Sequence, residues 1–172
     1  MVTVPLLSLQ QDSYMTAEDS SKGFQVILHS LPMEGREQLL EDIRSRRAES
    51  GAPLVVAGNA NEVVAIVSGQ ASLRMPVEGG SWIEIGRCGP GEIFGFESFM
   101  QGSVEPLEVV ALGPCLLQVL DGCSFQRLLM RFPSVYLGIT RVLSRRLETA
   151  QAILRDQRLK SAPKRPLSDR IH

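Results

Sequence analysis

The sequence predicts a mainly β domain, an antiparallel sandwich or barrel, with helices before and after it. The first observation is a series of short segments rich in β-branched residues, which follow one another at a spacing of roughly 8–12 residues. The second is glycine between these segments, at positions 58, 69, 79, 80, 86, 89, 91, 113 and 122. With 172 residues, of which 44% are hydrophobic and 22% charged, the chain should fold as one domain with a modest extension.

The segment before the strands predicts an arm followed by a helix. Residues 1–23 are mixed, with a polar run from Gln10 to Lys22, and form the expected arm or linker. Residues 33–49, MEGREQLLEDIRSRRAE, are rich in helix formers, and their leucines and isoleucine give one apolar stripe. Gly51 and Pro53 then end this helix.

The strand region spans residues 54 to 122. The predicted strands are LVVAG, EVVAIVSG, ASLRMPV, SWIEIGRCG, LEVVALG and CLLQVLDG. Gly79 and Gly80 lie between two of them and predict a tight hairpin, because glycine tolerates the positive φ angles of such turns.

Two helices are expected to complete the chain. The first is CSFQRLLMRFP, which Pro133 ends, and it completes a β domain expected over residues 24–135. The second is a long helix over residues 136–160, followed by a basic tail at 161–172. Along the long helix a heptad-like stripe predicts pairing with a second copy of the chain, although such a stripe also suits packing on the β domain. Its members are Tyr136, Thr140, Leu143, Leu147, Ala150 and Leu154.

Charge is distributed unevenly along a chain whose formal net charge is −1. From Cys88 to Gln126 there is no Lys or Arg, while four glutamates lie at 92, 97, 105 and 108. The C-terminal arm is basic, which is typical of a solvated helix face and also of contact with nucleic acid or an acidic partner. Its basic residues are Arg141, Arg145, Arg146, Arg155, Arg158, Lys160, Lys164 and Arg165.

The sequence offers little for catalysis or metal binding. It has no GxSxG, P-loop or HExxH motif, so we expect no enzyme and no cofactor. His29 as a haem ligand and Cys123 as a redox thiol at a helix start are minor alternatives. The three cysteines lack a CxxC spacing, which favours reduced thiols, with Cys88 and Cys115 as small buried hydrophobes. Without a signal peptide or an apolar span, the expected location is cytoplasmic.

Several motifs, taken together, resemble the cyclic nucleotide-binding domain family over residues 28–156. The glycines of GAPLVVAGNANEVVAIVSGQASL match the family's turn glycines, and GPGEIFG (Gly89–Gly95) is similar to the start of its phosphate-binding cassette. VVALGPCLLQVLDGCSFQRLL matches the closing strands and hinge helix. This family includes Crp/Fnr-type regulators, protein kinase A regulatory subunits and gated channels. The resemblance implies an antiparallel β-roll, or jelly-roll, and a sensory role.

The cassette departs from the family where the ligand would be held. The resemblance implies a Glu for the ribose hydroxyl and an Arg for the cyclic phosphate, but Phe96 and Glu105 stand at those positions. A carboxylate in place of the Arg turns attraction into repulsion and costs about 1–4 kcal/mol. Phe96 is equally consistent with core packing and with stacking on a ligand. The residues equivalent to the cassette are Phe94, Gly95, Phe96, Glu97, Ser98, Phe99, Glu105 and Pro106.

These observations favour a non-catalytic regulatory domain that does not bind cAMP or cGMP in the usual way. We expect a homodimer that acts through its C-terminal helix on a protein partner. The alternatives are a sensor of another nucleotide, a nucleoside or a cyclic dinucleotide, and the effector part of a Crp/Fnr-type regulator without its DNA-binding domain. Because only a short tail follows Lys160, direct reading of nucleic acid is not expected, and neither is a membrane partner.

Overall fold

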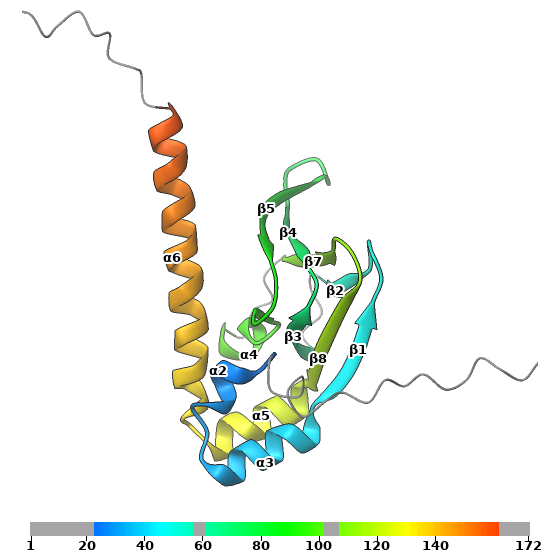
Figure 1. Ribbon diagram of the computed structural model, residues 1–172, viewed down its shortest axis with the longest axis vertical. Coiled ribbons are helices and arrows are strands. Elements are labelled where there is room, and N and C mark those ends of the chain that lie inside the picture. The colour runs from blue at the N-terminus through cyan, green and yellow to red at the C-terminus, as the bar shows by residue number, and fades with distance from the viewer. Residues whose placement is uncertain (1–22, 57–60, 102–106, 162–172) are drawn as a thin grey trace, which may run out of the picture.

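The computed structural model describes residues 23–56, 61–101 and 107–161. The elements in chain order are α2 (Gln25–Leu28), α3 (Met33–Asp42), β1 (Arg44–Ala48), β2 (Pro53–Val55), β3 (Glu62–Ser68), β4 (Ala71–Pro76), β5 (Trp82–Cys88), β6 (Ile93–Phe94), α4 (Glu97–Gln101), β7 (Glu108–Ala111), β8 (Cys115–Asp121), α5 (Gly122–Arg131) and α6 (Val135–Ser161). Figure 1 shows the sheets beside the long helix α6, with α2, α3 and α5 gathered at one end of the sheets.

The strands form two four-stranded antiparallel sheets within the described part of the chain. One sheet has the order β1-β8-β3-β6 and the other the order β2-β7-β4-β5. The predicted mainly β fold with flanking helices is therefore confirmed, and the six predicted strand segments correspond to β2, β3, β4, β5, β7 and β8. The hairpin predicted at Gly79 and Gly80 joins β4 to β5, and both glycines have positive φ angles.

The predicted helix over residues 33–49 is wrong in its second half. Helix α3 ends at Asp42, and residues 44–48 form β1, which pairs with β8 from Arg44↔Val119 to Ala48↔Cys115. Ile43 already has extended backbone angles. Arginine and alanine favour helix intrinsically, but the hydrogen bonds of a ladder with the buried strand β8 outweigh that preference.

Two groups of buried side chains stabilise the fold. One lies between the sheets and includes Ile66, Leu117 and Phe94. The other lies where the helices cover the end of the roll and includes Phe24, Phe96 and Phe125. Burial of large apolar side chains contributes about 1.5–3 kcal/mol each, so these two groups provide most of the favourable free energy of folding.

Helix α5 begins at a capped turn. The backbone N–H of Ser124 donates to the carboxylate of Asp121 at 3.0 Å, which satisfies one of the free donors at the helix start. This hydrogen-bonded contact with Ser124 holds the pKa of Asp121 below its usual value. The cap fixes the point at which β8 turns into the helical layer.

Helix α6 is attached to the body along its first half. Val135, Ile139 and Val142 are buried in the helical core, while the described side chains from 147 to 156 are all exposed. Gly138 lies so close to Ile27 of α2 that a Cβ at this position would be 2.9 Å from the Ile27 Cα. Beyond its first half, α6 projects along the roll, as Figure 1 shows.

No helix among the described residues is both long enough and apolar enough to cross a membrane.

Candidate functional site

The predicted cassette begins where β6 ends. Phe94 pairs with Val64 of β3, and Gly95 then turns the chain at a φ of +88°. A Cβ at Gly95 would overlap the carbonyl oxygen of Glu62, so only glycine allows this close approach to β3. The Ser98 hydroxyl donates to the Gly95 carbonyl at 2.9 Å and fixes the first turn of α4.

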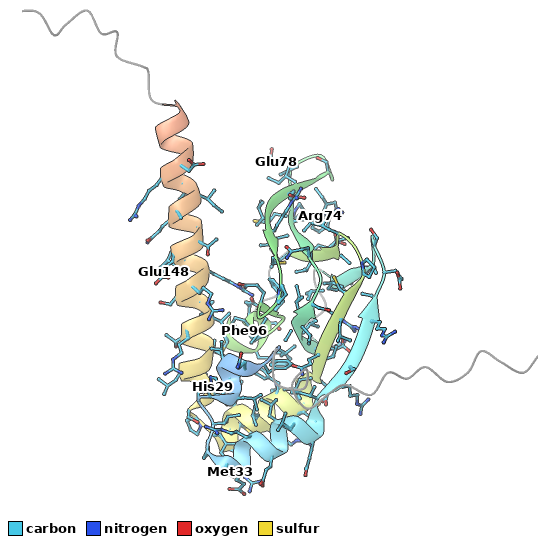
Figure 2. The ribbon with its side chains drawn as sticks, in the orientation of Figure 1. His29, Met33, Arg74, Glu78, Phe96 and Glu148 are labelled. Carbon is cyan, nitrogen blue, oxygen red and sulfur yellow. The ribbon has the colours of Figure 1, made fainter. Side chains whose placement is uncertain are left out.

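The aromatic side chains of the cassette are packed into the protein. Phe94 is buried between the sheets and Phe96 is buried in the helical core. Phe99 packs edge-on against Phe125 of α5, with 5.4 Å between ring centroids. Of the two interpretations of Phe96, the structure supports core packing, since the side chain is only 1% exposed. Figure 2 labels it beside α4.

Two acidic side chains, Glu97 of the cassette and Glu92 of the segment that leads into it, meet a guanidinium group from α6. Arg146 donates from Nη1 to Glu97 Oε1 at 2.5 Å and from Nε to Glu92 Oε2 at 3.4 Å. It also donates from Nη2 to the backbone carbonyl of Ile93. All three side chains are largely enclosed, with exposures of 25% for Arg146, 25% for Glu92 and 15% for Glu97.

The same guanidinium lies over aromatic rings. Its central carbon is 4.5 Å from the ring centroid of Phe94 and 5.4 Å from that of Phe96. Aromatic ring faces carry partial negative charge and attract cations within about 6 Å. Two carboxylates, a carbonyl and two rings therefore surround one cation.

Arg146 is the residue that sequence reasoning missed, because it was grouped with the basic arm. A signal was present in its spacing. Val135, Ile139, Val142 and Arg146 follow one another at helical intervals, so Arg146 continues the buried stripe of α6. The other signal was the run of glutamates without a nearby Lys or Arg, which indicates a need for a cation from elsewhere in the chain.

The remaining predicted site residues lie in different places. Glu105 and Pro106 lie outside the described residues. The stripe residues Tyr136, Thr140, Leu143, Leu147, Ala150 and Leu154 are exposed on α6, on a different side from the buried stripe. His29 is exposed at the end of α2, and no metal-binding cluster of His, Cys, Asp or Glu occurs among the described residues.

Two of the three thiols, Cys88 and Cys115, are not poised for reaction. Burial, reinforced by the nearby carboxylate of Glu92, raises the pKa of Cys88 to about 12. Burial also raises the pKa of Cys115, whereas Cys123 is exposed on α5. Because the thiolate is the reactive form, Cys88 and Cys115 behave as small apolar groups.

The sequence model of the cyclic nucleotide-binding domain matches residues 45–132, which is more than half of the chain. The chain belongs to the cyclic nucleotide-binding domain family. Glu92 and Glu97 lie within the matched segment, whereas Arg146 lies beyond its end. No curated protein matches the chain in sequence.

Solved structures of the family share the fold. The Thermus thermophilus catabolite activator protein is 26% identical with a TM-score of 0.60, over 75% of this chain and 61% of that one. A cyclic nucleotide-binding domain from Methylobacillus flagellatus is 19% identical with a TM-score of 0.64, over 85% and 90%. A regulatory subunit of a cAMP-independent protein kinase A from Trypanosoma brucei is 19% identical with a TM-score of 0.58, over 74% and 47%. The chain thus spans about three fifths of the Thermus protein.

The turn at Gly95 yields a test of how the cassette is built. Gly95→Ala should lower the free energy of unfolding by about 3–4 kcal/mol, because it combines an unfavourable positive φ with a clash against the backbone of Glu62. Gly79→Ala is the matched control, since Gly79 has a φ of +92° but no atom within 4 Å of its Cβ position. It should cost about 1–2 kcal/mol. Urea denaturation measures both, and equal losses would contradict the close approach.

Proposed function

We propose that this chain is a non-catalytic regulatory domain whose cassette does not bind cAMP or cGMP in the usual way. The observation that carries the proposal is the Arg146 guanidinium, which is bound between Glu92 and Glu97 of the cassette. A cyclic phosphate placed there would face two carboxylates, and unit charges 4 Å apart repel by about 4 kcal/mol near a protein surface.

The position of Phe96 supports the same conclusion. In the resemblance, a Glu at this position holds the ribose, but Phe96 is buried against the helical core and offers no polar atom to a sugar. The fold itself does not require a cAMP response, since the similar Trypanosoma brucei protein is described as the regulatory subunit of a cAMP-independent kinase.

The output of the domain is the position of α6. The Arg146 side chain contacts the cassette, and the described α6 side chains from 147 to 156 are exposed. A change in the cassette would therefore alter the direction in which the distal half of α6 projects. A contact that is either made or broken, as between Arg146 and the cassette, can pass such a local change to a partner.

The exposed stripe on α6 supports a homodimer. Leu143, Leu147 and Leu154 are 45%, 60% and 59% exposed, although each is a large apolar side chain. They recur at heptad spacing on one side of the helix, which is the arrangement that two helices bury between them. The occupant we infer is α6 of a second copy, and the pair presents a protein partner with a fixed geometry.

The ligand specificity is tested by thermal unfolding of the wild-type chain. A ligand at about one hundred times its Kd stabilises by about 2.7 kcal/mol. That corresponds to roughly 5–10 °C for a domain of this size. We expect no such shift with cAMP or cGMP, and a cAMP-binding family member serves as the positive control. A shift with either nucleotide would contradict the proposal, whereas a shift with a nucleoside or cyclic dinucleotide would replace it by a sensor of changed specificity.

The proposed dimer is tested by a substitution that introduces a charge into the exposed stripe of α6. Leu147→Glu should convert the dimer to a monomer, because two buried carboxylates would face each other across the helix pair. Thr149→Glu adds the same charge at an exposed position off the stripe and should leave the dimer intact. Sedimentation equilibrium distinguishes the two. A wild-type monomer, or equal dissociation of both variants, would contradict pairing through this stripe.

A further inference from the structure

The cassette has the chemistry of a site for a planar cation. Each of the three guanidinium nitrogens of Arg146 is used, by Glu97, by Glu92 and by the carbonyl of Ile93. The Phe94 ring lies against the guanidinium at 4.5 Å. A guanidinium is flat and carries donors in a fixed fork, which suits carboxylates at its edge and a ring against its face. A compact ammonium group would satisfy fewer of these contacts.

The site requires a cation to be stable. With Arg146 in place, the side chains of Glu92 and Glu97 are only 25% and 15% exposed, and without Arg146 both carboxylates would lose the cation that pairs with them. Like charges in such a position repel each other, and partly buried carboxylates lose hydration. From Cys88 to Gln126 the sequence has no Lys or Arg, so the cation must come from outside that segment.

The attachment of the present occupant is local. The described side chains of α6 from 147 to 156 are exposed, so the distal half of the helix buries little apolar surface against the roll. Withdrawal of Arg146 would leave the buried contacts of Val135, Ile139 and Val142 in place. The guanidinium can therefore leave the cassette without unfolding the domain.

We propose that the cassette is a guanidinium-binding site with an exchangeable occupant. Arg146 fills the site from within the chain, and a guanidinium group from outside the chain takes its place when α6 is displaced. The ligand class is thus a guanidinium compound, either free or as an arginine side chain of a partner protein. This inference rests on the proposed function in one respect, namely that the cassette does not hold a cyclic nucleotide.

The first arm of the test uses full-length Arg146→Ala. Its thermal midpoint should fall by about 3–6 °C, as expected for loss of a partly buried charge-assisted contact. Arg145→Ala is the matched control, because Arg145 is exposed one residue earlier on the same helix, and its midpoint should stay unchanged. Arg146→Lys keeps the charge without the planar fork, and it replaces the alanine variant if that variant fails to fold.

The second arm adds methylguanidinium chloride to Arg146→Ala, with methylammonium chloride at equal concentration as the control. Methylguanidinium should restore the midpoint saturably and methylammonium should not. The rescue should disappear in Arg146→Ala/Glu97→Gln. An unchanged midpoint in Arg146→Ala, absence of rescue, or equal rescue by methylammonium would each overturn the proposal.

The third arm distinguishes the source of the ligand and tests exchange in the wild type. A short arginine-containing peptide that binds Arg146→Ala more tightly than methylguanidinium indicates a protein partner, and equal binding indicates a small guanidinium compound. Either ligand should speed amide exchange in the turn of α6 around Arg146 of the wild-type chain. No change there would overturn the exchange. The guanidinium and peptide measurements do not use a cyclic nucleotide. Failure of the guanidinium proposal can therefore be distinguished from failure of the proposed function.

Discussion

The contact between Arg146 and the carboxylates of Glu92 and Glu97 is the interaction that joins the cassette to the middle of α6. It joins a helix at the C-terminal side of the domain to the turn after β6, 49 residues earlier in the chain at Glu97. Because all three charged side chains are largely enclosed, the contact is stronger than an ordinary surface ion pair and less screened by salt. In the proposed function, this contact couples the direction of α6 to the state of the cassette.

The shape and the charge of the cassette are set by different residues. Gly95 and the Ser98 hydroxyl reproduce the tight turn and the short helix with which the family cradles a phosphate. Glu92 and Glu97 place two carboxylates beside that turn, where Arg146 pairs with both of them. Under the proposed function, the backbone of a binding fold persists while side chains change the ligand that the site accepts.

Most of the fold could be predicted from the sequence because strands and turns leave signals in short, local segments. Alternating and β-branched segments between glycines mark strands wherever the pleated surface is half buried, and the positive φ angles at Gly79 and Gly80 confirm the predicted hairpin. Strand β1 was not predicted, because RSRRA has helical preferences and becomes a strand only by pairing with β8. The two-residue strand β6 was too short to leave a pattern.

The site was harder to predict because it joins distant segments. The acidic residues of the cassette are evident in the sequence, and the resemblance predicts a departure from the family at Phe96 and Glu105. The direction of the Arg146 side chain depends on how α6 packs, which Gly138 sets by its close approach to α2. No local pattern in the sequence predicts how closely α6 approaches α2. Burial of Phe96 likewise depends on helices contributed by both ends of the domain.

The most direct test of this account is a double-mutant cycle between Arg146 and Glu97, measured by urea denaturation of the wild type, Arg146→Ala, Glu97→Ala and the double variant. The account predicts a coupling free energy of about 1–2 kcal/mol in favour of the pair, as expected for a partly buried charge-assisted hydrogen bond. A coupling indistinguishable from zero would show that α6 is not held by the cassette and would contradict the account.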